Sequence, residues 1–163
     1  MEKERLKYTI TRFDHYYDSV NNKGNVILGL STFIVGGLIA SYPFFLQKVN
    51  CTFWVHANLI TLITLGLAAM LIMIIASTPY LSSKSNSVFY FLSVSKMKKD
   101  DFAKWSEGLQ ENYELEDMRN QTYLLAKGLT NKFRMLKWAS MLINIQFVLL
   151  VPFIILLINS LSN

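Results

Sequence analysis

The chain is 163 residues long, carries a net charge of +5, and is 52% hydrophobic and 13% aromatic. A soluble domain of this length is usually less apolar, and the apolar residues here gather in three blocks, so the composition points to a single-domain membrane protein. The lone cysteine, Cys51, excludes an internal disulfide and lacks the spacing of a metal site.

Residues 1–25 are predicted to form an amino-terminal helix on the cytoplasmic side. The region is too charged to be a signal peptide. Its apolar side chains alternate at spacings of four and three, which is a heptad seam. The seam consists of Leu6, Ile10, Phe13, Tyr17 and Val20.

Three apolar segments, 26–46, 53–77 and 139–161, are each long enough to cross the hydrocarbon core as a helix. Residues 47–52 leave room for a tight turn, so the first two segments, within 26–77, are expected to form a hairpin. Trp54 and Trp138 lie at the predicted membrane interfaces, where indole rings are favoured.

The distribution of basic residues predicts the orientation. Five Lys and Arg precede residue 26, one lies in 47–52 and ten lie in 78–138, which sum to the sixteen of the chain. Basic regions stay in the cytoplasm. We therefore expect a multi-pass protein of the bacterial inner membrane with its amino terminus inside and its carboxy terminus outside.

The region 78–138 is expected to be a helical cytoplasmic stalk. Residues 88–94 are ambiguous between a strand and a turn of helix, and Asp100 or Asp101 is the expected cap of a short helix. A long helix is predicted from near Glu114 into the third membrane segment. Its heptad seam consists of Leu115, Met118, Thr122, Leu125, Leu129, Phe133 and Leu136. The fold class is thus an all-α membrane protein whose two seamed helices pack side by side, within one subunit or between subunits.

Four basic residues of the long helix fall within an arc of about 80° beside its seam. They are Arg119, Lys127, Arg134 and Lys137. In an oligomer this stripe would form a positive ring suited to nucleotide phosphates; the alternative is a solvated face that touches lipid headgroups. Trp105, Tyr113 and Tyr123 could add stacking surfaces for bases.

One narrow face of the first long helix carries small and polar residues from the cytoplasm to the middle of the membrane. It consists of Asp18, Asn22, Asn25, Gly29, Thr32, Gly36 and Ala40. Small residues four apart let helix backbones approach closely, and amides can bond across to another helix. The face is either a helix–helix interface or the border of a water path in an oligomer. Proton pumps usually bury a carboxylate or a base in the membrane. The only such residue in the three segments is His56, so a proton pump or proton-coupled carrier is not favoured.

Nothing in the sequence carries a catalytic motif. The chain has no Walker loop, no GxGxxG, no HExxH and no nucleophile elbow. His15 and His56 lie in separate regions. We therefore expect no enzyme activity, no catalytic residue, no bound metal and no cofactor.

Several stretches resemble a known family. YDSVNNKGNVILGLSTFIVGGLIA resembles the start of the transmembrane domain of Pycsar effectors, where a short Asn/Asp-Lys element precedes the first membrane helix. SVFYFLSVSKMKKDDFAKW is similar to the aromatic segment and acidic-capped helix of that family, and NQTYLLAKGLTNKFRMLKWA to its run into the last membrane helix. The similarity covers residues 13–150. The matching positions are Asn22, Lys23, Gln121, Tyr123, Lys127, Lys132 and Phe133.

The resemblance implies a bacterial inner-membrane effector of antiphage defence that responds to a nucleotide signal from a partner synthase, impairs the membrane and stops growth of the infected cell. Many such effectors carry a separate cyclic-nucleotide-binding domain, for which this chain has no room, so the signal would bind the cytoplasmic helices or act through another protein. The chain also resembles effectors of the Hailong type, which a partner nucleotidyltransferase restrains with oligonucleotides.

Two functions from different classes are favoured at this point, and a third, a small transporter subunit, is least favoured because the membrane segments lack buried charges. The first is an oligomeric channel or membrane-disrupting protein, controlled by a nucleotide or oligonucleotide whose partner synthase is encoded nearby. The second is a structural or adaptor membrane protein that tethers a cytoplasmic partner through exposed heptad seams.

Overall fold

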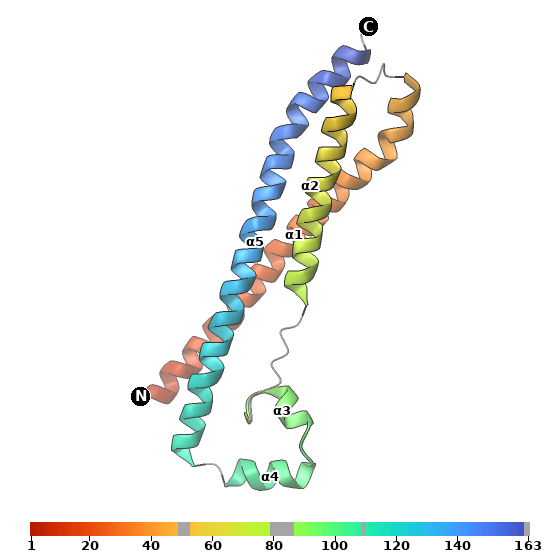
Figure 1. Cartoon of the computed structure of the whole chain (residues 1–163). Helices are drawn as coiled ribbons and strands as arrows, with labels where there is room; N and C mark the ends of the chain where they lie inside the picture. The colour runs from red at the N-terminus through yellow and green to blue at the C-terminus, as the bar shows by residue number, and fades with distance from the viewer. Residues whose placement is uncertain (49–52, 79–86, 109, 162–163) are drawn as a thin grey trace. The chain divides into compact units, whose positions relative to one another are not determined.

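The computed structural model describes residues 1–48, 53–78, 87–108 and 110–161, and in these ranges the chain forms five helices and no strand. In chain order the helices are α1 (Glu2–Lys48), α2 (Phe53–Ser77), α3 (Phe91–Ser95), α4 (Lys99–Glu107) and α5 (Glu111–Leu161) (Figure 1). The ambiguous aromatic stretch therefore ends in the short helix α3. The all-α fold class predicted from the sequence is confirmed.

Two of the helices are unusually long and unbroken. α1 has 47 residues and α5 has 51, and each joins a charged part of the chain to an apolar part without interruption. α5 begins at Glu111, slightly before the predicted start near Glu114. The predicted turn over 47–52 is wrong for its first two residues, which belong to α1, and 49–52 lie outside the described residues. Pro43 lies inside α1 and Pro152 inside α5.

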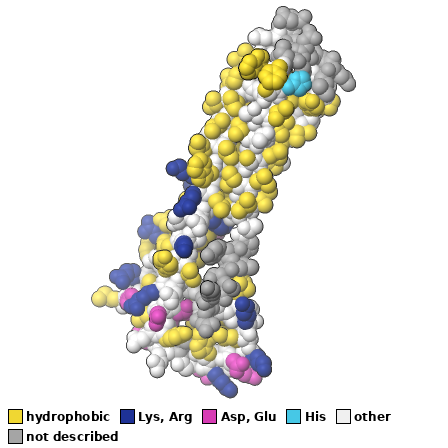
Figure 2. All heavy atoms as spheres, in the orientation of Figure 1, with side chains coloured by type: hydrophobic (Ala, Val, Ile, Leu, Met, Phe, Trp, Pro, Cys, Tyr) yellow, Lys and Arg dark blue, Asp and Glu magenta, His cyan; other side chains and the backbone are white. Residues whose placement is uncertain are grey.

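Three of the helices, α1, α2 and α5, are long enough and apolar enough to cross a membrane. Their apolar stretches expose many large hydrophobic side chains, which Figure 2 shows in yellow among white atoms. Examples that are at least half exposed are Val26, Phe33, Ile60, Leu71, Val148 and Ile155. Such a surface suits lipid and not water, so the protein is a membrane protein.

The chain divides into two compact units. Unit 1 comprises Met1–Ser19 and Pro79–Asn131, and unit 2 comprises Val20–Thr78 and Lys132–Asn163. Unit 2 holds the apolar stretches of α1, α2 and α5. Unit 1 holds the beginnings of α1 and α5 together with α3 and α4.

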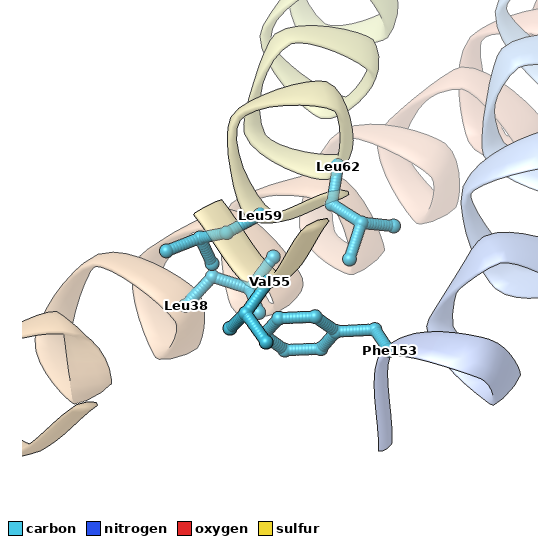
Figure 3. Close-up of a cluster of buried hydrophobic side chains, with 5 residues drawn as sticks. All are labelled: Leu38, Val55, Leu59, Leu62 and Phe153. Carbon is cyan, nitrogen blue, oxygen red and sulfur yellow. The ribbon is translucent and has the colours of Figure 1, made fainter. Parts of the chain in front are cut away.

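In unit 2, α2 runs antiparallel to α1. Gly24 of α1 lies against Met73 of α2, and Val35 lies against Gly66, so the residue numbers rise on one helix as they fall on the other. Farther along, a hydrophobic cluster joins all three helices (Figure 3). The cluster consists of Leu38 of α1, Val55, Leu59 and Leu62 of α2, and Phe153 of α5.

In unit 1, the first turns of α1 and α5 lie side by side and run parallel. Lys3 Nζ is 2.6 Å from Glu114 Oε2. Farther along both helices, the Tyr17 hydroxyl donates a hydrogen bond of 2.9 Å to the carbonyl oxygen of Leu125. The two predicted seamed helices therefore pack together within one chain.

The predicted seams are half-buried or buried, with one exception. Phe133 of α5 is 40% exposed, so it is not part of the seam that packs within the chain. The steps from Leu125 to Leu129 and from Leu129 to Phe133 are both of four residues, and each such step turns about 40° beyond a full turn. The neighbouring residue Lys132 is half-buried, whereas Phe133 is exposed.

The predicted aspartate cap of the short helix is also wrong. The N-cap of α4 is Lys98, without a side-chain hydrogen bond, and Asp100 and Asp101 lie within the first turn. Acidic residues there still favour the helix, because the first turn has the positive end of the helix dipole.

Candidate functional site

The predicted small and polar face lies wholly on α1, and none of its members is buried against another described part of the chain. All seven residues are exposed: Asp18, Asn22, Asn25, Gly29, Thr32, Gly36 and Ala40. A Cβ built at Gly29 or Gly36 meets no atom within 4 Å. The face is therefore not a contact between helices of one chain.

The opposite side of α1 is the side that packs. Val20, Ser31, Val35 and Leu38 are buried there, and a Cβ at Gly24 would collide with the Met73 side chain. Thus α1 uses a different set of small residues inside the chain from the set that it exposes. The periodicity of the sequence identified only the exposed set.

Polar side chains are buried among the apolar ones in unit 2. Gln146 of α5 is fully buried, and its Nε2 donates a hydrogen bond of 2.9 Å to the carbonyl oxygen of Leu62. Among the described residues no group pairs with Gln146 Oε1, Ser31 Oγ or Asn58 Oδ1. None of these three side chains is ionisable, so they can form hydrogen bonds but cannot carry a proton as a titrating relay would.

The four residues of the predicted basic stripe differ in whether they are paired with an acidic residue. Arg119 lies in unit 1, where its Nε and Nη2 donate hydrogen bonds of 2.8 Å to the two carboxylate oxygens of Glu2. This bidentate pair lowers the pKa of the Glu2 carboxyl and raises that of Arg119, mainly through the hydrogen bonds. Arg119 is therefore already occupied by a carboxylate of the same chain.

The other three stripe residues are exposed and make no ion pair with any described residue. Lys127 belongs to unit 1, whereas Arg134 and Lys137 belong to unit 2. Nearby, Lys132 Nζ donates a hydrogen bond of 3.0 Å to Asn21 Oδ1 of α1. Of the sequence-predicted phosphate ligands, Lys127, Arg134 and Lys137 keep cationic groups accessible to a ligand.

Two of the three predicted stacking residues come together in unit 1. Trp105 of α4 and Tyr113 of α5 line an open cavity of about 240 Å³ with Gly108 and Gln110. Tyr123 does not line this cavity, and it is 68% exposed on α5. No sequence signal singled out Gln110, which joins the site because it directly precedes α5.

A second ion pair holds the first turn of α1. Lys3 and Glu114 are in hydrogen-bond contact, which raises the pKa of the Lys3 ammonium. Together with the Glu2–Arg119 pair, it ties two consecutive residues of α1 to α5. Sequence reasoning missed both pairs, because nothing in a single sequence says which of many surface charges will meet.

Metal-ligating side chains do not cluster in the part of the chain that the structure describes: no group of three or more His, Cys, Asp or Glu could hold an ion there. The positions that carry the family resemblance are mostly on the surface. Asn22, Lys23, Tyr123, Lys127 and Phe133 are exposed. Gln121 is half-buried, with its Nε2 atom lacking a partner among the described residues.

Comparison with known proteins gives one match. The family model of the Pycsar effector protein domain matches residues 5–159. The comparisons with curated proteins and with solved structures gave no match. The matched range includes the exposed face of α1, the buried Gln146 and all three candidate membrane helices. The chain therefore belongs to the Pycsar effector transmembrane family and is a membrane effector protein of antiphage defence.

Proposed function

We propose that the protein is an oligomeric membrane effector that depolarises the bacterial inner membrane and so arrests the infected cell. The observation that carries the proposal is the exposed small and polar face of α1. Amides without a partner cost roughly 1–3 kcal/mol each in an apolar environment, so Asn22 and Asn25 favour contact with another subunit or with water. Gly29 and Gly36 allow another backbone to approach closely.

In this proposal the face either joins subunits or borders a water path between them. Thr32 contributes little polarity, because its hydroxyl already donates to the carbonyl of Leu28 at 2.8 Å. Asn22 and Asn25 can therefore supply bonds across an interface near one membrane surface, while Gly29, Gly36 and Ala40 set the close spacing deeper inside.

Control is proposed to come from a nucleotide or oligonucleotide that binds the basic residues of α5. Pycsar effectors in general act with a nucleotide cyclase and a cyclic nucleotide signal. Lys127, Arg134 and Lys137 are exposed and without ion-pair partners among the described residues, and Arg119 becomes available if a phosphate displaces Glu2. Since α5 is unbroken from Glu111 to Leu161, a ligand that moves its charged part would also move its apolar part.

In the proposed orientation, the two basic regions, residues 1–25 and 78–138, lie in the cytoplasm. The amino terminus is proposed to be inside and the carboxy terminus outside, on the basis of the basic residues. The partner synthase is proposed to be encoded nearby. A ligand made in the cytoplasm would then reach α5 directly.

The adaptor alternative receives less support. It depends on exposed heptad seams, and the seams are half-buried or buried apart from Phe133. Other exposed aromatic residues of unit 1, such as Tyr8 and Tyr123, both 68% exposed, do not belong to either seam.

Two neighbouring glycines provide the test. Gly36 and Gly37 both have open space within the single chain where a Cβ would lie, yet only Gly36 lies on the polar face. We expect Gly36→Leu to abolish cross-linking between subunits and depolarisation, read with a voltage-sensitive dye in cells with and without the partner synthase. Gly37→Leu should preserve both. The proposal is wrong if the wild-type protein leaves the potential unchanged under both conditions, or if the two variants behave alike.

A further inference from the structure

A short aromatic segment in unit 1 is held firmly at its start. Ser87 is fully buried and donates a hydrogen bond of 2.9 Å from its hydroxyl to Asp117 Oδ2 of α5. The backbone N–H of Val88 donates to the same oxygen at 3.0 Å. Asp117 is itself 6% exposed. These bonds attach Ser87 and Val88 to α5 and so fix where the segment that follows them begins.

The residues that follow expose apolar rings. Phe89 is 53% exposed and Phe91 is 64% exposed. Tyr90, which is half-buried, packs edge-on against Phe91, with ring centroids 5.4 Å apart. Two exposed phenyl rings next to a fixed backbone indicate a site that an apolar partner or surface covers.

Three lysines follow within the next turns of the chain. Lys96, Lys98 and Lys99 are exposed and form no ion pair with any described residue. No acidic residue occurs from Val88 to Lys99, and Asp100 and Asp101 then begin α4. The segment 88–99 therefore combines exposed aromatic rings with unpaired positive charge, and its basic character ends at Lys99.

We propose that segment 88–99 docks on the anionic lipid surface of the membrane that the protein spans. Aromatic rings are favoured at the level of the headgroups, and each lysine near an anionic leaflet gains roughly fivefold in binding. Chain length makes the contact attainable. Thr78 and Ser87 are nine residues apart, which keeps Ser87 within about 30 Å of the end of α2. This inference concerns a surface that the proposed channel does not use.

The test measures how deeply a spin label at position 91 lies in vesicles that contain the full chain. Cys51 is replaced by Ser, and a nitroxide is attached after Phe91→Cys or, as a second site, Phe89→Cys. The control carries the label after Tyr123→Cys, an aromatic residue of unit 1 that is at least as exposed. Collisions with oxygen report lipid, and collisions with a water-soluble nickel chelate report solvent.

In vesicles with a quarter of phosphatidylglycerol we expect the oxygen-to-nickel ratio at 91 and at 89 to exceed that at 123 several-fold. The difference should shrink in purely zwitterionic vesicles and after Lys96, Lys98 and Lys99 are all changed to Gln. A label at 91 that is as open to nickel as the control would overturn the proposal, because the segment would then lie in water. Protection from both reagents would also overturn it, since a protein surface would be the cover. A ratio indifferent to lipid charge and to the lysines would reject the anionic-lipid assignment.

Discussion

Gln146 of α5 and Leu62 of α2 are joined by a hydrogen bond of 2.9 Å between a side-chain amide and a backbone carbonyl inside the apolar unit. The approach is possible because the residue one turn farther along α2 is Gly66. A Cβ built on Gly66 would lie 2.7 Å from Gln146 Nε2 and would also collide with Val35 of α1. The missing side chain of Gly66 thus lets all three helices of unit 2 meet at one level.

Replacing Gly66 by alanine should therefore destabilise unit 2. Overpacking of a close contact costs about 1–3 kcal/mol, which exceeds the gain of about 1 kcal/mol that alanine brings to a helix. We expect the variant to unfold at a lower concentration of denaturing detergent. Circular dichroism, recorded during the titration, measures the unfolding midpoint. The matched control is Gly37→Ala, whose Cβ meets open space and which should keep or raise the midpoint. Equal midpoints for the two variants would contradict this account of Gly66.

The contact between Tyr17 and Gly128 predicts that Gly128→Ala changes stability in opposite directions with and without the Tyr17 hydroxyl. The hydroxyl of Tyr17 donates to the Leu125 carbonyl and occupies the space that a Cβ on Gly128 would need. Gly128→Ala should lower stability in the wild-type chain. In a Tyr17→Phe background the obstructing oxygen is absent, so the same change should stabilise α5 by about 1 kcal/mol, the usual advantage of alanine over glycine. A double-mutant cycle by chemical denaturation gives the coupling, and additive effects would show that the two residues do not meet.

The Glu2–Arg119 pair predicts an acid-sensitive contact at the beginning of α1. The pKa of Glu2 is lowered from 4.5 by its hydrogen bond to Arg119. A carboxyl with a lowered pKa contributes stability that is present above 4.5 and is lost as the pH falls through the folded pKa. Carbon NMR of glutamate-labelled protein should show the Glu2 carboxyl titrating below 4.5, with the resonance assigned by Glu2→Gln.

The companion variant is Arg119→Gln, which should return the Glu2 midpoint toward 4.5. The other pair behaves in the opposite sense, because Glu114 raises the pKa of Lys3 above 10.5 and its contribution is lost as the pH rises through that folded value. Both pairs are therefore intact near neutral pH. A Glu2 midpoint that Arg119→Gln leaves unchanged would show that the pair does not form.

Charge reversal at Lys127 and Arg134 is expected to weaken nucleotide binding. If these side chains contact phosphates, the affinity for a fluorescent cyclic nucleotide or a short fluorescent oligonucleotide should fall in the Lys127→Glu, Arg134→Glu protein. The slope of log affinity against log salt should also become shallower, by about 0.7 for each phosphate of a single strand that the variant no longer neutralises. Lys104→Glu, at an exposed site on α4, is the control. Binding that ignores salt and both substitutions would exclude phosphate contacts at these positions.

The sequence predicts the elements that depend on local periodicity. Runs such as 53–77 are apolar throughout, and the heptad spacing of Leu6, Ile10 and Phe13 indicates a helix with one packed side. The same reasoning anticipates that α5 runs unbroken from the charged region into the third membrane segment, because no Gly-Pro break lies between them. It was also predictable that the small and polar residues of α1 share one side of the helix, but not that this side is exposed in the chain.

The contacts between helices were not predictable from one sequence. Whether Gly36 or Gly66 is the glycine that packs depends on which helix lies beside it, and periodicity carries no such information. Arg119 meets Glu2 across 117 positions of sequence, although other acidic residues are closer along the chain. Phe133 was placed on the seam because its spacing from Leu129 fits, yet two successive steps of four rotate it away from the packed side.

Pro43 and Pro152 each remove one donor from the ladder of hydrogen bonds in their helix. The carbonyl groups of Ile39 in α1 and Val148 in α5 consequently lose their α-helical donors, and both lie in unit 2. Each of these two helices thus has a joint near its far end, where a bend costs less than elsewhere in the helix. Bending of α1 and α5 is therefore expected at these joints, within the limit set by Phe153, which the hydrophobic cluster holds against α1 and α2.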